Sequence, residues 1–271
     1  MTIAAAVLAA AAAGAAAADP GGGTRSFWSA LSLSARGGLA AGAPRFELSR
    51  PFTEYLEEGR LDSIYTRSLG SDLELGIEYA VSRHIAVSAS YGWAHPAASG
   101  RWSATFPHPL YLERPRHANG TLDGLRYRED ALHVDLVLQS ARGRLRYGVF
   151  AGAARLQVKT HLIDTPQYRQ EYPFDTVSVF LVPRSFWIGS ATSVSGGAAL
   201  DYGVTRRLGL SARLRFSRAR PELHRTGVDE RPQLDAGGLR AGLGLTLRLG
   251  PVRKGRPGGI DSEASGRDAR R

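Results

Sequence analysis

The chain contains no cysteine, so disulfide bonds and thiolate chemistry are excluded from the start. It also lacks any run of about 18 apolar residues beyond its N-terminal end, which excludes a helical membrane protein. The one long apolar stretch, Ile3 to Ala18, ends in three alanines before Asp19 and Pro20. Although no Lys or Arg precedes it, this stretch predicts a secretory signal peptide over residues 1–18.

Acidic residues are the minority charge, with 25 Asp and Glu against 35 Lys and Arg, which gives a net charge of +10. This balance favours phosphate-bearing partners, such as nucleic acid, anionic lipid headgroups or lipopolysaccharide. The basic residues are spread along the chain instead of being gathered on one stripe. We therefore expect lipid and lipopolysaccharide as partners and no nucleic acid.

Apolar side chains recur at every second position from about residue 72 to residue 249. The clearest copy is Leu239 to Leu249, in which leucine or alanine alternates with arginine, glycine or threonine. A period of two indicates β-strands with two different faces. Here one face is almost continuously apolar and the other is polar or charged, which predicts a closed barrel with lipid outside and a polar lumen inside.

Eight stretches with this pattern predict eight strands. They cover about 27–39, 72–81, 85–93, 131–139, 144–158, 186–204, 208–217 and 239–249. The predicted fold is all-β: a transmembrane, antiparallel, up-and-down β-barrel over residues 19–250. A ten-stranded barrel is the alternative, because Val177 to Val182 could form a further strand.

The connections between these strands alternate in length. Residues 82–84, 140–143 and 205–207 are tight turns, whereas residues 40–71, 94–130, 159–185 and 218–235 form long loops. Transmembrane barrels show this alternation, with the short turns in the periplasm and the long loops outside.

Aromatic residues on the apolar face gather at the two ends of the strands. Those beside the short turns are Tyr79, Tyr147 and Tyr202, and those beside the long loops are Tyr91, Trp93 and Phe216. This placement predicts two aromatic girdles at the two interfaces of a membrane.

With these features, most of residues 27–250 resemble the small OmpA- and OmpX-type outer-membrane β-barrels of Gram-negative bacteria. The resemblance lies in the hairpins at 73–93, 132–153 and 196–216 and in the closing strand at 237–249. It implies export to the bacterial outer membrane. Such barrels usually end on an aromatic residue, but this closing strand ends at Leu249 and a basic tail follows at residues 251–271. We expect the tail to be disordered and periplasmic, with peptidoglycan as a candidate partner.

The polar face of the predicted strands carries both acids and bases. The acids are Asp72, Glu74, Glu78, Asp135 and Asp201, and the bases are Arg146, Arg213, Arg215, Arg240 and Arg248. We expect Asp135 to pair with Arg146 and Asp201 with Arg213, each pair across a short turn. An eight-stranded barrel is just wide enough for side chains to fill, so these groups would form a plug of paired charges. A pore lined by arginines is the alternative.

Nothing in the sequence indicates a catalytic, cofactor or metal site. Enzymes on such barrels need a nucleophilic Ser or a His base near the outer interface. The candidate loop residues, which form no recognisable pair, are His95, His108, His117, His161, Ser99 and Ser103. Histidines without clustered acids give no metal-ligand spacing. We expect a non-catalytic protein with a structural or surface-interaction role; a small-solute pore and a lipid-modifying enzyme are the alternatives.

The long loops contain aromatic residues interleaved with arginine and proline. These are Trp102, Phe106, Tyr111, Tyr168, Tyr172 and Phe174. Binding often resides in loops on a rigid scaffold, so they could form a recognition surface for host or other surface ligands. Alternatively, they pack on one another and cap the barrel.

Overall fold

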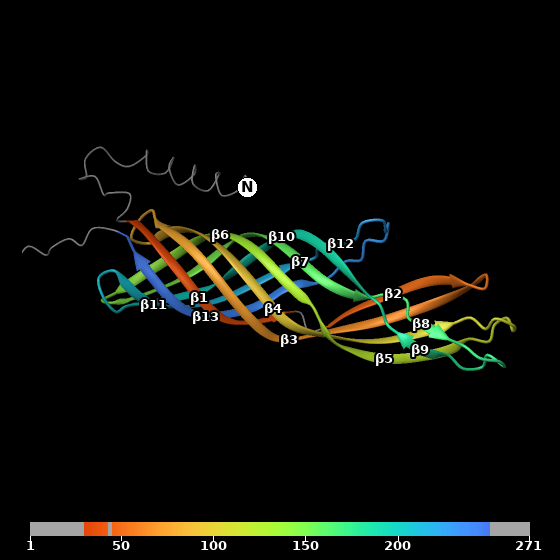
Figure 1. The fold of residues 1–271 in the computed structure, drawn as a ribbon. Coiled ribbons are helices and arrows are strands. Elements are labelled where there is room, and N and C mark those ends of the chain that lie inside the picture. Colours follow the sequence, from red (N-terminus) through yellow and green to blue (C-terminus); the bar gives the residue numbers. More distant parts are fainter. Residues whose placement is uncertain (1–29, 43–44, 250–271) are drawn as a thin grey trace, which may run out of the picture.

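The computed structural model describes residues 30–42 and 45–249, and every regular element among them is a β-strand. Eight strands form a ring in the order β1 (Leu31–Gly42), β3 (Glu57–Ala80), β4 (Ile85–Phe106), β6 (Tyr127–Arg142), β7 (Leu145–Ile163), β10 (Arg184–Gly203), β11 (Leu208–Ala219) and β13 (Ala236–Arg248). Neighbours are antiparallel, and β13 pairs back with β1 (Figure 1). The predicted eight-stranded up-and-down barrel is confirmed.

The ten-stranded alternative is wrong. Residues 178–181 do form a strand, β9 (Ser178–Leu181), but it pairs only with β8 (Gln167–Arg169) in a separate two-stranded sheet. The predicted signal peptide at residues 1–18 and the basic tail at residues 251–271 lie outside the described residues. Among the described residues there is no helix long and apolar enough to cross a membrane, a finding that does not bear on crossing by strands.

The barrel strands are longer than a membrane requires. β3 has 24 residues, β4 has 22 and β10 has 20, whereas about 9–11 residues suffice for a transmembrane strand. Beyond the barrel, β2 (Arg45–Glu54) pairs with β3, β5 (Arg116–Leu125) pairs with β4, and β12 (Glu222–His224) pairs with β10. Figure 1 shows the resulting β-structure extending away from the barrel at one end. We call this part, residues 45–66, 98–125 and 165–182, the platform.

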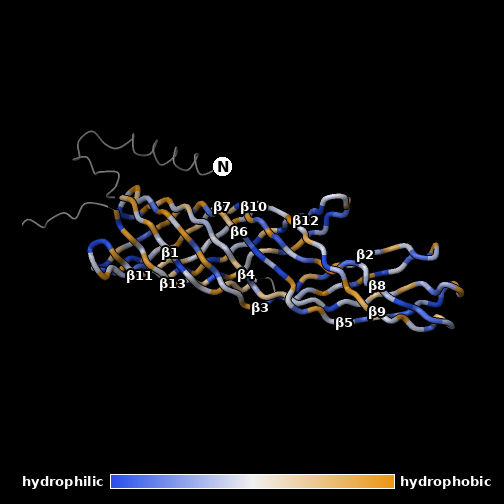
Figure 2. Tube along the Cα trace, in the orientation of Figure 1, coloured by the Kyte–Doolittle hydropathy of each residue, from blue (hydrophilic) through white to orange (hydrophobic). Residues whose placement is uncertain are grey.

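The polarity of the two strand faces inverts between the barrel and the platform. On β4, the outward side chains from Ile85 to Trp93 are apolar, but farther along Trp102 and Phe106 are buried inside while Arg101 is exposed. The hydropathy of successive residues alternates along both parts (Figure 2). The strands thus pass from a barrel that is apolar outside to a platform that is apolar inside.

Much of what the sequence predicts as long loops is therefore strand. The segments at 40–71, 94–130 and 159–185 contain the outer parts of β3, β4 and β7 and all of β2, β5, β8 and β9. A β-bulge between Arg67 and Gly70 gives β3 one extra residue relative to β4, which changes the parity of its inward positions. The apolar cluster inside this region includes Leu61, Tyr65, Trp102, Phe106, Leu156, Ile163 and Trp187.

Candidate functional site

The inward side chains of the barrel form a network of opposite charges. Within the described residues it joins six arginines to six carboxylates, and no side chain among them is more than 19% exposed. The members are Arg36, Arg67, Arg146, Arg213, Arg215, Arg240, Asp72, Glu74, Glu78, Glu129, Asp135 and Asp201. Because the two signs are equal in number, the network as a whole is neutral.

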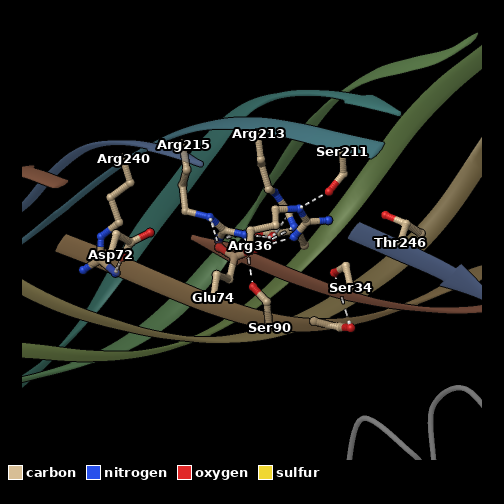
Figure 3. Close-up of polar contacts among 12 residues, drawn as sticks. Ser34, Arg36, Asp72, Glu74, Ser90, Ser211, Arg213, Arg215, Arg240 and Thr246 are labelled. Carbon is tan, nitrogen blue, oxygen red and sulfur yellow. Dashed lines mark hydrogen bonds and ion pairs between the residues drawn. The ribbon is translucent and has the colours of Figure 1, made fainter. Parts of the chain in front are cut away.

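The centre of the network is a cluster of three arginines around two acids (Figure 3). Arg36 Nη1 lies 2.7 Å from Glu74 Oε1, and Arg213 Nη1 lies 3.3 Å from the same oxygen. Arg213 and Arg215 also donate to Asp135 Oδ2, at 3.0 and 2.8 Å. Each acid therefore holds at least two guanidinium groups, and strands on opposite sides of the barrel are joined through the lumen.

An inward aromatic ring completes this cluster. Phe150 on β7 lies under both guanidinium groups, with ring-centre distances of 4.0 Å to Arg213 Cζ and 5.0 Å to Arg215 Cζ. Cations over an aromatic face gain electrostatic attraction, more so when water is excluded. The sequence pattern gives no hint of this role, because Phe150 stands among small residues on the polar face of its strand.

A second group of charges lies toward the platform. Arg240 Nη2 donates to Glu129 Oε2 at 2.9 Å, and Arg240 Nη1 donates to Asp72 Oδ1 at 3.3 Å. Glu129 also accepts from the Tyr127 hydroxyl at 2.5 Å, and its Oε1 lies 3.6 Å from Arg67 Nη1. Tyr127 is buried, and this burial, together with the Glu129 charge, raises its pKa well above the usual value.

A third group lies toward the short turns. Arg146 donates to Glu78 at 2.8 Å and to Asp201 at 3.1 Å. Thr246 also donates to Asp201, at 3.1 Å. The remaining predicted base, Arg248, is half-buried at this end and forms no ion pair with any described residue.

Both pairings expected from the sequence, Asp135 with Arg146 and Asp201 with Arg213, are wrong. Asp135 does not reach Arg146, because the register places Arg146 opposite Ala141 and Asp135 opposite Gly152. Asp201 lies directly opposite Arg146 on the neighbouring strand and pairs with it instead. Arginine side chains span the narrow lumen, so strand closure decides the partners more than hairpin spacing does.

Three members of the network are absent from the residues predicted as its members. Arg36 occupies a polar position between Ala35 and Gly37 on the first strand. Strict period-two alternation along this strand would have placed it on the inward face. Arg67 and Glu129 lie in segments that the sequence predicts as loops, because the apolar face of the barrel strands ends before them. His133 faces inward and is completely buried, and neither of its ring nitrogens has a hydrogen-bond partner among the described residues.

The six predicted girdle residues lie near the two ends of the apolar belt. Tyr147 and Tyr202 are about half exposed near the short turns, and Tyr79 on β3 lies at the same end. At the other end, Phe216 is 56% exposed, and the rings of Tyr91 and Trp93 meet edge to face at 4.7 Å. Between these ends the outward face bears leucines such as Leu243, which is 72% exposed.

Comparison with known proteins finds similarity of fold only. No family model matches the chain, and no curated protein matches it. The solved structures that are similar to it include the following three. Neisserial surface protein A is 10% identical (TM-score 0.43, 81% of this chain and 97% of that chain). The outer membrane protease OmpT from Escherichia coli is 9% identical (0.39, 80% and 96%). The N-terminal β-barrel domain of OprF from Pseudomonas aeruginosa is 14% identical (0.36, 80% and 96%). The chain is similar in fold to these barrels, and its own strands form the eight-stranded antiparallel barrel that its sequence predicts.

Three segments meet at the far end of the platform. The rings of Phe52 and Phe106 lie 5.6 Å apart, and those of Phe106 and Tyr168 lie 4.5 Å apart. Gln170 donates to the Tyr55 hydroxyl at 2.6 Å, and Arg116 donates to the Gln170 side chain, also at 2.6 Å. The hairpins β2–β3 and β4–β5 and the β8–β9 segment therefore form one packed unit.

The end of this unit displays apolar side chains. Leu56 is 99% exposed, Tyr172 is 81% exposed and Leu112 is 79% exposed; Leu110 and Tyr111 are also exposed. We call these five residues the distal tip. Of the six loop aromatics, Trp102 and Phe106 are buried in the core and Tyr168 packs against it, whereas Tyr111 and Tyr172 face outward. Trp102, Phe106 and Tyr168 thus pack as the capping interpretation expects, and the recognition surface stays a prediction.

Among the described residues, no hydrogen bond joins one of the candidate histidines to one of the candidate serines. His108 Nδ1 accepts backbone N–H groups from Leu110 and Tyr111, at 3.1 and 3.2 Å, so it stabilises a turn. His117 contacts Thr105, and the Ser99 hydroxyl contacts Thr66. A group of three or more His, Asp or Glu side chains able to hold a metal ion does not occur in the described part of the chain.

Proposed function

We propose that this chain is a non-catalytic outer-membrane β-barrel whose lumen is closed by paired charges and whose distal tip takes part in surface interactions. The observation that carries the proposal is the packed platform, which continues the barrel strands and exposes apolar side chains at its far end. Large apolar side chains left in water at a protein surface commonly mark an interaction site.

Placement in the outer membrane is supported by the outward face of the barrel. Leucines, valines and aromatics cover it and are exposed in the isolated chain, which is unfavourable in water and favourable in lipid. Closure of the ring pairs the backbone groups of every barrel strand with neighbours on both sides, as a bilayer core requires.

Closure of the lumen is supported by the balance of its charges. Six arginines and six carboxylates meet in confined contacts, and the apolar cluster around Trp187 and Leu156 lies above them. An unpaired buried charge is costly, so each member depends on its partners. A side-chain network of this kind leaves the strands mutually fixed and gives solutes no continuous wide path.

The interaction role can be tested on cells that display the full chain. The variant Leu56→Ser/Leu112→Ser/Tyr172→Ser removes the most exposed apolar groups of the distal tip, and we expect it to lose adhesion to immobilised extracellular-matrix proteins. The matched control is Val228→Ser, in the exposed loop after β12. Equal adhesion by the two variants and the wild type would refute a role for the tip.

The non-catalytic assignment has its own test. Expression of the chain should leave the composition of lipid A and phospholipids unchanged, as measured by mass spectrometry of outer-membrane extracts. A new or missing acyl chain that depends on the protein would favour the lipid-modifying enzyme instead.

A further inference from the structure

One face of the barrel carries a cluster of basic side chains just beyond its apolar belt. On the outward side of β6 and β7, Arg128 lies opposite Lys159, and Arg155 lies opposite Leu132. Arg126 adjoins them, because its carbonyl accepts the backbone N–H of His161 at 2.9 Å. We call Arg126, Arg128, Arg155 and Lys159 the basic face.

Acidic groups neutralise only part of this face. Asp130 is the single acid on outward positions 126–132 of β6, 155–161 of β7 and 186–192 of β10; on β12, the exposed Glu222 lies opposite Ser190 and forms no ion pair with any described residue. It lies 2.7 Å from Arg128 Nε and 3.3 Å from Lys159 Nζ, and its side chain is only 5% exposed. Arg126 and Arg155 form no ion pair with any described residue; Arg155 donates instead to the Ser190 hydroxyl at 2.6 Å. The face therefore keeps a positive charge that is open to a ligand.

The strand register places this charge at the outer end of the apolar belt. The outer girdle residues Tyr91 and Phe216 register with Arg155 and Ala151 on β7, so Arg155 lies at the outer end of the apolar belt. Trp93 lies opposite Asp130, and the Arg128–Lys159 pair follows one step farther out. A lipid whose acyl chains lie against the apolar belt would bring its headgroup to these side chains.

The cluster belongs to one side of the barrel. The mutually registered outward residues Leu39, Ser71 and His95 on β1, β3 and β4 include no Lys or Arg. Arg220 and Arg218, near the end of β11, share Asp235 at 3.0 and 3.7 Å. A one-sided, incompletely paired cluster indicates a site and not a general basic ring.

His161 reports on the local field beside the cluster. Burial lowers its pKa, and the guanidinium charges of Arg126 and Arg184 lower it further. The guanidinium groups of Arg126 and Arg184 thus lie close enough to His161 to lower its pKa, and burial has the larger effect.

We propose that the basic face binds the phosphorylated headgroup of lipopolysaccharide in the outer leaflet. The proposal rests on the outer-membrane placement proposed above. Guanidinium and ammonium groups pair with phosphate oxygens through charge-assisted hydrogen bonds, and the two phosphates of a lipid A headgroup provide two such partners. Arg155 and Arg126, which lack carboxylate partners, make the strongest contribution.

Lipid A binding to the refolded mature chain in detergent micelles tests this. The variant Arg126→Gln/Arg155→Gln should bind bisphosphorylated lipid A roughly thirtyfold more weakly than the wild type, at about 1 kcal/mol per basic side chain. Monophosphorylated lipid A should bind the wild type more weakly than the bisphosphorylated form. The matched control Arg83→Gln/Arg206→Gln removes the same charge from two exposed short turns and should leave binding unchanged.

Three results would overturn the inference: equal weakening by both variants, equal affinity of the wild type for the two forms of lipid A, or displacement of lipid A by soluble heparin at equal potency. Heat-dependent electrophoretic mobility of each variant checks that the barrel is intact. If the variants fold and lipid A binding does not change, the inference fails and the proposed function stands. A wild type without such mobility would defeat both.

Discussion

Asp135 illustrates how much one carboxylate matters inside this barrel. Its side chain is fully buried and accepts hydrogen bonds from Arg213, Arg215 and Ser195. Removal of its charge would leave Arg213 and Arg215 with Glu74 as their carboxylate partner, and Glu74 already pairs with Arg36. A buried charge that loses its partner destabilises a protein far more than an exposed one does.

We therefore expect Asp135→Asn to lower the free energy of unfolding by about 3–5 kcal/mol. Urea titration of the refolded protein, followed by heat-dependent mobility, measures this. The matched change Glu78→Gln should cost about 1 kcal/mol or less, because its carboxylate is 19% exposed and Arg146 keeps Asp201 as a partner. Similar losses in both variants would contradict the central role of Asp135.

Tyr65 gives the platform a sensitivity to alkaline pH. Burial raises the pKa of its hydroxyl above the usual value of 10.0, and the hydroxyl accepts the backbone N–H of Ile163 at 2.8 Å. A raised pKa in the folded state means that the stabilisation is complete below the unfolded pKa. The stabilisation is then lost as the pH rises from about 10 through the folded pKa.

Tyr65→Phe should accordingly be less stable at neutral pH by about 1–3 kcal/mol, because the Ile163 N–H loses its acceptor. Above pH 10 its stability should fall less steeply than that of the wild type. Denaturant midpoints measured between pH 7 and pH 12 test both points. The exposed Tyr172→Phe serves as the control, and an identical slope in Tyr65→Phe and wild type would disprove the expectation.

At the scale of single elements, the sequence predicts the membrane part of each strand and misses its continuation. Alternation is easy to detect while one face is uniformly apolar, as from Ile85 to Trp93. On β4 the apolar positions then change parity, from odd numbers to the even-numbered Trp102, Ala104 and Phe106. In the sequence, this change of parity and the bulge in β3 both look like the end of a strand. The strand in fact continues, and its apolar side turns inward where the surroundings change from lipid to water.

Strand β13 allows a depth-dependent test of the apolar belt. Leu243→Arg places a charge near the middle of the belt and should cost about 2–4 kcal/mol in lipid vesicles, whereas Leu239→Arg, opposite Phe216 at the outer girdle, should cost about 0–1 kcal/mol. Unfolding free energies in vesicles provide the measurement. Equal costs at both positions would mean that this face does not contact lipid as assigned.

At the scale of the whole molecule, the sequence identifies which residues enter the lumen better than it identifies their partners. Period-two alternation places Asp135, Arg213 and Arg215 on the inward face regardless of the rest of the fold. Their contacts depend on the closure of the ring, on arginine side chains that span it and on Phe150 beneath them. Distances across a closed barrel are not encoded in local spacing.

The complete barrel should not conduct ions. In planar lipid bilayers we expect the wild type to give no stable conductance steps, because paired charges and the apolar cluster around Trp187 occupy the interior. A porin inserted under the same conditions serves as the positive control. Reproducible steps from the wild type would favour the small-solute pore over the closed lumen.

The continuity of the strands has a mechanical consequence. The part of β4 beyond Trp93, residues 94–106, is about 40 Å long at about 3.3 Å per residue, and it belongs to the same strand that lines the barrel. A ligand bound at the distal tip would therefore be held at a fixed distance from the membrane. A pull on that ligand along the strands loads rows of ladder hydrogen bonds in shear, all at once, instead of peeling them apart one by one. Under the proposed surface role, the strands would transmit such a load directly from the distal tip to the barrel.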